Sequence, residues 1–350
     1  MRLSAVAMLV AVLATAGCRT ATGPEPEPTS TDVPTALTDL GANQYRGFAG
    51  GLYPNGSNTV PADHAAEGRR RASLVQARSA DGAPSPSGRI VLLSIGMSNT
   101  TQEFCAASAY TACDSWTFMG QARADAEVER QRLVLLNGAR GGQVASRWAS
   151  ATSPEYDRIR DSGLAPLGLS ERQVQIVWVK IANAGPTVRL PAANADAFTL
   201  AAQHGSVLRA LQARYPNLQL VFLSSRIYAG FATTTLNPEP YAFESGLAVK
   251  WVIESQIAQV RGTQPAVPIA AGNLDYRTGT PWVAWGPYLW ADNAQKPRSD
   301  GFFWVREDFQ NDGTHPARTG EDKVGRLLLE FFKSSPFTRC WFVAAQTCTP

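Results

Sequence analysis

The sequence predicts an α/β protein in which helices cover both faces of a central parallel sheet. Short segments of almost continuous apolar residues recur along the chain, and segments with helical spacing or composition separate them. Strands that are buried on both faces have this continuous apolar character, and their alternation with helices is typical of parallel sheets. The predicted strands are residues 90–95, 133–136, 174–179, 218–223 and 267–270.

Helices are expected between and after these strands. In residues 195–214, apolar side chains recur at the spacing of one helix face, and Pro216 follows. The last helix is expected from about Pro316 to Phe332, because proline is favoured in the first turn of a helix. The other expected helices are residues 115–130 and 244–260.

The ends of the first three predicted strands are expected to form one site. Residues 96–99, 137–142 and 181–183 directly follow these strands. Ligands of open α/β sheets bind beyond the carboxyl ends of the strands. We therefore expect the three segments to meet at one edge of the sheet.

The composition fits a globular, core-forming chain. Hydrophobic residues make up 44% of the 350 residues, charged residues make up 17%, and the formal net charge is +3. The one basic run, Arg69–Arg71, is expected to be a solvated face, so nucleic acid is not an expected partner. No segment after the N-terminus is apolar for the length of a membrane span.

Residues 1–17 are predicted to be an export signal. Arg2 precedes an apolar run, Leu3–Leu13, that is too short to remain as a membrane anchor. The Ala-Gly-Cys at 16–18 resembles a bacterial lipobox, which would make Cys18 the lipidated first residue. Thr15 stands where lipoboxes usually carry Leu, and Ala14-x-Ala16 also suits the ordinary signal peptidase, so free secretion is the alternative.

The cysteine count agrees with lipidation of Cys18. The chain has five cysteines, an odd number, and four of them form two pairs that are close in sequence. We expect the disulfides Cys105–Cys113 and Cys340–Cys348 in an oxidising compartment, which leaves Cys18 over.

The chain is then expected to have four parts after the signal. Residues 18–40 contain many Pro, Thr and Glu and predict a flexible, lipid-anchored tether. Residues 41–85 predict an irregular extension, residues 86–335 the main domain, and residues 336–350 a tail held by a disulfide.

Ser98 is the candidate nucleophile, and His315 and Asp312 are its candidate base and orienting acid. Ser98 follows the first strand after Gly96, which allows a sharp turn. A serine hydroxyl needs a base to take its proton. Of the three histidines, only His315 lies in a loop with an aspartate three positions before it, and that aspartate can hold the imidazole ring.

Three donors at the strand ends could stabilise the oxyanion that attack on an ester creates. Such a charge requires hydrogen-bond donors that are already in position. The candidates are the backbone N–H groups of Ser98 and Gly142 and the side-chain amide of Asn183.

Other catalytic chemistries lack their motifs. The histidines are scattered, no HExxH occurs, and the cysteines look paired, so no metal is expected. The phosphate-binding GxxxxGK[ST] and the dinucleotide-binding GxGxxG are also missing, and no cofactor is expected. A G-x-S-x-G nucleophile elbow is absent because position 100 is Thr.

The order Ser98, Gly142, Asn183, Asp312-x-x-His315 resembles the SGNH (GDSL-like) hydrolase superfamily. Residues 95–99 (Ile-Gly-Met-Ser-Asn) resemble its first block in the form of sialate and other carbohydrate O-acetylesterases. Residues 139–143 with the later Trp148 resemble the second block of that branch, and residues 312–316 with the later Gly320 resemble the last. The resemblance implies a flavodoxin-like three-layer α/β/α sandwich and hydrolysis through an acyl-enzyme, without a metal.

Two positions depart from the family pattern. The third block is usually Gly-x-Asn-Asp, whereas residues 181–184 read Ile-Ala-Asn-Ala and keep only Asn183. Met97 stands where the family name implies Asp. Since that residue is not the nucleophile, we expect Met97 to alter the tuning of the activity rather than to abolish it.

An ester, small or polymeric, is the expected substrate, and the membrane is expected as a partner only through the lipid anchor. We predict removal of acetyl or other short acyl groups from carbohydrate or cell-envelope material. A lipase or thioesterase of the same fold and a non-catalytic, glycan-binding lipoprotein are the alternatives. Trp282, Trp285, Trp290 and Trp304 could stack on sugars or pack in the core. The candidate substrate contacts are Asn99, Gly141, Trp148 and Trp304.

Overall fold

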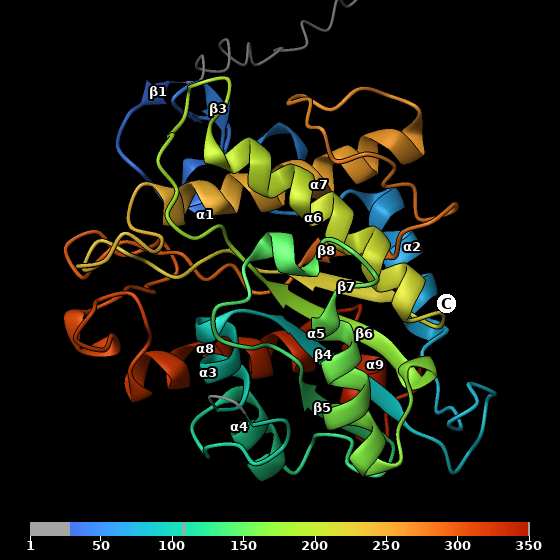
Figure 1. Cartoon of the computed structure of the whole chain (residues 1–350). Coiled ribbons are helices and arrows are strands. Elements are labelled where there is room, and N and C mark those ends of the chain that lie inside the picture. Colours follow the sequence, from blue (N-terminus) through green and yellow to red (C-terminus); the bar gives the residue numbers. More distant parts are fainter. Residues whose placement is uncertain (1–28, 107–108, 349–350) are drawn as a thin grey trace, which may run out of the picture.

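The computed structural model describes residues 29–106 and 109–348. The predicted export signal and Cys18 lie outside these residues. A five-stranded sheet crosses the molecule, its strands are all parallel, and their order is β5-β4-β6-β7-β8 (Figure 1). The strands are β4 (Ile90–Gly96), β5 (Leu133–Asn137), β6 (Val174–Lys180), β7 (Leu220–Leu223) and β8 (Trp282–Trp285).

Helices cover both faces of this sheet and complete a three-layer α/β/α sandwich. The helices α6 (Asp196–Arg214) and α7 (Tyr241–Arg261) lie on one side. On the other side are α3 (Ser98–Phe104), α4 (Phe118–Ala124) and α8 (Arg318–Ser334), as Figure 1 shows. The predicted fold class is therefore confirmed.

The strands send alternate side chains into two separate cores. In β4, Val91, Leu93 and Ile95 pack in the core under α6 and α7. Ile90 and Leu92 pack in the opposite core, under α3, α4 and α8. Each strand is thus buried on both faces, which is why its sequence is continuously apolar.

The remaining elements are short, apart from α2. They comprise β1 (Ser30–Thr31), α1 (Leu37–Leu40), β2 (Gln44–Tyr45), β3 (Phe48–Ala49), α2 (Ala62–Ser73), α5 (Pro154–Arg158) and α9 (Arg339–Phe342), with helical turns at Pro54–Gly56, Ala145–Trp148, Ile159–Leu164, Ala165–Leu167, Glu171–Gln173 and Arg306–Asp308. The strands β1, β2 and β3 form a second, small sheet.

The predicted fifth strand is wrong in position. Residues 267–270 form no strand, and β8 is the fifth strand of the sheet. Pro265 and Pro268 lack the backbone N–H that a strand in a sheet must donate. The four residues of β8 are all buried, including Trp282 and Trp285.

Three predicted helices have different bounds, and α7 begins at Tyr241 rather than at residue 244. The helix predicted over 115–130 ends at Ala124, because the chain beyond it pairs with the C-terminal segment: the Glu129 N–H donates to the Phe342 carbonyl at 2.8 Å. The last helix begins at Arg318 rather than Pro316. The Ala317 N–H donates to the Asp308 carbonyl at 2.8 Å, which holds the preceding residues outside the helix.

The N-terminal segments are more ordered than the sequence suggested. Residues 18–40 were expected to be a flexible tether, yet Leu37 and Leu40 of α1 are buried in the core under α6 and α7. Residues 41–85 were expected to be irregular, yet they contain α2, whose Gly68 packs against the ring of Trp282.

The C-terminal segment is likewise part of the second core and not a tail. Phe337, Trp341 and Phe342 are buried there. The disulfides Cys105–Cys113 and Cys340–Cys348 are both present. Among the described residues, no helix combines the length and the hydropathy that crossing a membrane requires.

Leu37 provides a test of the N-terminal correction. Its side chain is 0% exposed, so Leu37→Ala is expected to lower the free energy of unfolding by about 2–5 kcal/mol in urea denaturation. Val33→Ala is the matched control, because Val33 lies in the same segment and is 60% exposed. Equal small effects of the two substitutions would mean that α1 is not docked.

Candidate active site

Ser98 is the first residue of α3 and lies just beyond the carboxyl end of β4. The turn between them is tight, since a Cβ at Gly96 would lie 2.2 Å from Thr100 Oγ1 and 2.3 Å from the Lys180 carbonyl oxygen. The Thr100 hydroxyl donates to that same carbonyl at 2.6 Å. Only glycine fits at position 96, and the start of α3 is thereby fixed against the end of β6.

Ser98, His315 and Asp312 form a continuous chain of hydrogen bonds. Ser98 Oγ lies 2.8 Å from His315 Nε2, and His315 Nδ1 lies 2.5 Å from Asp312 Oδ2. Because the carboxylate accepts the proton of Nδ1, Nε2 is the acceptor for the serine hydroxyl. The three residues that the sequence singled out for nucleophile, base and orienting acid therefore meet at hydrogen-bonding distance.

The loop that carries His315 is built around the Asp312 carboxylate. Asp312 Oδ1 accepts the backbone N–H groups of Thr314 at 2.9 Å and His315 at 3.0 Å. Burial acts to raise the pKa of Asp312, but the hydrogen bonds from His315 and Thr314 lower it overall. The carboxylate thus stays ionised beside the imidazole.

Gly313 and Asn99 fix the position of this loop. Gly313 has a φ of +64°, and a Cβ there would lie 1.8 Å from the Phe231 carbonyl oxygen, so no other residue fits. The Asn99 side-chain amide donates to the Thr314 carbonyl at 3.0 Å. Asn99, expected to contact substrate, therefore also ties the His315 loop to α3.

The segment after β5 lies beside Ser98. The Arg140 N–H donates to the Gly96 carbonyl at 3.2 Å, and a Cβ at Gly141 would lie 3.8 Å from Ser98 Cβ. Gly142 has a φ of +76°, a conformation that favours glycine. Among the described residues, the N–H groups of Ser98 and Gly142 have no protein acceptor, so both can donate to a bound oxyanion.

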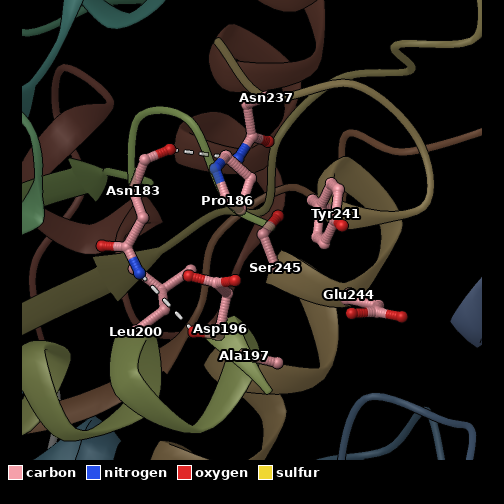
Figure 2. Close-up of a pocket in the computed structure, with 9 residues that line it drawn as sticks. All are labelled: Asn183, Pro186, Asp196, Ala197, Leu200, Asn237, Tyr241, Glu244 and Ser245. Carbon is pink, nitrogen blue, oxygen red and sulfur yellow. Dashed lines mark hydrogen bonds between the residues drawn. The ribbon is translucent and has the colours of Figure 1, made fainter. Parts of the chain in front are cut away.

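Asn183 follows β6, but its side-chain amide contacts the start of α6. Its side-chain nitrogen lies 3.5 Å from the Asp196 backbone carbonyl at the start of α6 (Figure 2). The backbone carbonyl of Asn183 accepts a hydrogen bond from the Asn237 side-chain amide at 3.1 Å. The pocket drawn in Figure 2 encloses only about 10 Å³, enough for about one water molecule. At 3.5 Å the Asp196 contact is at the long limit for a hydrogen bond, so it holds the Asn183 amide only weakly.

A larger cavity of about 250 Å³ opens on Ser98 and His315. Its lining combines the predicted residues with others from the ends of β6 and β7 and from the loop before α7. The lining residues are Met97, Ser98, Asn99, Gly142, Val144, Asn183, Ala184, Arg226, Leu236, Asn237, Thr314 and His315. The lining combines apolar side chains with several polar ones, as ligand pockets do.

Sequence reasoning missed several of these residues. Arg226 lies three positions beyond the end of β7, so the rule that located the first three segments could also have found it. Leu236 and Asn237 lie in a long loop without a motif, and no local signal marks them. The hydrogen bond from the Gly185 N–H to the Leu236 carbonyl, at 2.9 Å, brings this loop to the segment after β6.

Two predicted substrate contacts are wrong. Trp148 and Trp304 are both 0% exposed, so neither can touch a substrate. Their indole nitrogens donate to backbone carbonyls, of Gln143 at 3.2 Å and of Leu289 at 3.1 Å. Trp282, Trp285 and Trp290 are buried as well, so the tryptophan cluster is core packing and not a sugar-stacking surface.

The other two histidines are buried in the interior of the protein. His64 of α2 is buried, and its Nε2 lies 2.8 Å from the Val283 carbonyl oxygen. His204 is buried in α6. Burial lowers the pKa of both to about 4.

A fully buried ion pair joins α3, the helix that begins at Ser98, to the end of β6. Lys180 Nζ at the end of β6 lies 2.5 Å from both carboxylate oxygens of Glu103, in α3. Neither side chain is exposed, and burial lowers the pKa of Lys180 to about 8 despite the attraction of Glu103. A buried pair of this kind costs desolvation but strongly disfavours any arrangement that separates its partners.

In the described part of the chain, no three His, Cys, Asp or Glu side chains gather in an arrangement that could hold a metal ion.

Comparisons with known proteins gave similar solved structures only. No protein-family model and no curated protein matches the chain. An extracellular lipase from Streptomyces rimosus is 14% identical, with a TM-score of 0.32 over 69% of this chain and 97% of the other. A carbohydrate esterase family 2 enzyme from Corynascus is 12% identical, with a TM-score of 0.35 over 70% and 66%. A mutant acetyl-xylooligosaccharide esterase from Geobacillus is 13% identical, with a TM-score of 0.36 over 71% and 96%.

Asp312→Asn tests the role of the carboxylate. An amide at this position would no longer hold the imidazole in the form that accepts the serine proton, so kcat for ester hydrolysis is expected to fall about 10⁴-fold. Hydrolysis of an activated acetate ester measures the loss, and circular dichroism checks the fold. Asp32→Asn is the control, since the Asp32 side chain is 79% exposed. A loss below about tenfold, small beside the usual contribution of acid–base groups, would exclude this role for Asp312.

Proposed function

We propose that this protein is a serine ester hydrolase of the SGNH type. The hydrogen-bonded chain from Ser98 through His315 to Asp312, at 2.8 Å and 2.5 Å, carries the proposal. The parallel sheet and the order of the site segments along the chain support it. The N–H groups of Ser98 and Gly142, which have no acceptor within residues 29–106 and 109–348, support it as well. The placement within the carbohydrate O-acetylesterase branch stays a prediction from the sequence.

The proposed reaction proceeds through an acyl-enzyme. His315 Nε2 takes the proton of Ser98 while the serine oxygen attacks the ester carbonyl carbon. The N–H groups of Ser98 and Gly142 bind the resulting oxyanion, and Asn183 can join them after rotating away from Asp196. His315 then gives its proton to the departing alcohol, and a water molecule, activated by the same imidazole, hydrolyses the acyl-enzyme and frees the serine.

The proposed substrates carry acetyl or other short acyl groups, on carbohydrate or cell-envelope material. The cavity of about 250 Å³ supports short groups over long chains. The lipase or thioesterase alternative requires room for a long acyl chain beyond this cavity. The intact triad weighs against the alternative of a glycan-binding protein without activity.

Ser98→Ala tests the nucleophile. Hydrolysis of p-nitrophenyl acetate by residues 19–350 is expected to fall by at least about 10⁴-fold in this variant, because the attacking oxygen is lost. A labelled fluorophosphonate should mark Ser98 in the parent chain and nothing in the variant. Ser146→Ala is the matched control, because Ser146 is exposed and outside the cavity lining.

Equal hydrolysis by the parent chain and Ser98→Ala would refute the proposed mechanism. The length of the acyl chain separates the enzyme hypotheses. Acetate esters should be better substrates than octanoate esters, and the reverse order would favour the lipase alternative.

We also propose that the protein is exported and attached to the cell envelope by a lipid on Cys18. Two disulfides within the described residues support an oxidising compartment. Secretion after cleavage behind Ala16 is the alternative. In either case the partners are the ester substrate and, for the lipidated form, the membrane that holds the anchor.

Cys18→Ser tests the anchor. In a bacterial host, the parent chain is expected in the membrane fraction with a fatty-acid label, and the variant is expected to lose the label and leave that fraction, because serine cannot form the thioether. A parent chain found unlabelled in the medium would show secretion instead. The Ser98 esterase assay on both forms checks that the exported protein is folded.

A further inference from the structure

Arg226 is a buried cation in the wall of the active-site cavity. It lines this cavity together with Ser98 and His315, and the residue is only 1% exposed. Its guanidinium atoms Nε and Nη2 have no hydrogen-bond partner among the described residues. Buried polar groups are normally paired, and a buried charge without a partner is costly.

The backbone of Arg226 is held firmly at the end of β7. The Ser224 N–H donates to the Val179 carbonyl at 3.0 Å, which continues the pairing of β7 with β6. The Arg226 N–H donates to Ser245 Oγ of α7 at 3.1 Å. The guanidinium is therefore carried by a rigid part of the sandwich.

The carboxylates whose charges act on Arg226 are already paired with other groups. They are Glu103, Glu239 and Asp312. Glu103 pairs with Lys180, and Asp312 with His315. Glu239 accepts Trp290 Nε1 at 2.7 Å and two backbone N–H groups at 3.0 Å each. In the described part of the chain, none of the three forms an ion pair with Arg226.

An arginine cannot relieve this situation by losing its proton. Lysine and histidine become neutral when burial is costly, but a guanidinium stays charged in proteins. A ligand anion in the cavity would therefore gain a charge-assisted hydrogen bond and would supply the missing partner. A single guanidinium matches a carboxylate, which is planar and carries one charge, better than it matches a group with two negative charges.

We propose that Arg226 binds a carboxylate of the substrate, so that the preferred ester carries a carboxylate close to its scissile bond. This inference rests on the proposed ester hydrolysis and narrows its substrate class. The carboxylate can belong to the acyl part, as in a monoester of a dicarboxylic acid, or to the alcohol part, as in an acylated hydroxy acid or acidic sugar.

Two matched pairs of esters distinguish these sources. The p-nitrophenyl monoester of succinate is compared with p-nitrophenyl butyrate, and 4-acetoxybenzoate is compared with phenyl acetate. The parent chain should prefer the acid in one pair. Arg226→Gln should reduce that preference, taken as a ratio of kcat/KM values, about 10- to 100-fold, the range expected for losing a hydrogen bond to a charged group.

The controls separate a local pair from a change in net charge. Arg69→Gln removes one positive charge from an exposed side chain of α2, outside the cavity lining, so it should keep the preference. Arg226→Lys retains the positive charge but lacks the planar guanidinium, so it should keep part of the preference for the acid ester. If Arg226→Gln does not melt like the parent chain, Arg226→Lys supplies the comparison.

Binding to the inactive protein tests the inference without catalysis. Calorimetry should show the preferred acid binding to Ser98→Ala and no binding to the Ser98→Ala, Arg226→Gln double variant. The carboxylate proposal is overturned if neither acid is preferred or bound, or if Arg226→Gln slows acid and neutral esters equally. The proposed function fails separately, when hydrolysis of the neutral esters does not depend on Ser98.

Discussion

The close approach of the end of β4 to the end of β6 is the constraint on which the site depends. Gly96 is in contact with the Lys180 carbonyl, and Thr100 bonds to the same oxygen. This contact lets α3 begin at Ser98, directly at the carboxyl edge of the sheet. The buried pair of Lys180 with Glu103 also ties α3 to the end of β6. The nucleophile is thus placed by backbone contact and buried charge together.

The second half of the site is placed by a loop that packs against another loop. Asp312 organises the turn that presents His315, while Gly313 lets this turn contact the Phe231 carbonyl. The loop between β7 and α7 also contributes Leu236 and Asn237 to the cavity. Nucleophile and base come from positions far apart in the sequence, so their 2.8 Å contact depends on the packing of every layer.

The sequence positions of the aromatic and charged residues do not reveal which of them pack in the core and which line the site. The tryptophans before the Asp312 loop resemble a ligand platform in sequence, but their rings fill the two cores. Arg226 has no motif around it, yet it lies in the cavity wall as a buried cation whose Nε and Nη2 have no hydrogen-bond partner among the described residues. The local sequence does not reveal whether a polar side chain will have a hydrogen-bond partner, because such partners come from segments that are distant in the sequence.

The sequence by itself determined the parallel sandwich, the four strands β4 to β7, and the candidates Ser98, Asp312 and His315. Continuous apolar runs and residues at strand ends are local signals, and a parallel sheet turns them into one edge. Only the tertiary structure decided that β8 is the fifth strand, that α1 and the C-terminal segment belong to the cores, and that Trp148 and Trp304 are inaccessible. It also decided the orientation of Asn183 and the burial of Arg226 in the cavity wall. These outcomes depend on competition between distant groups for the same space and hydrogen bonds, which no local pattern records.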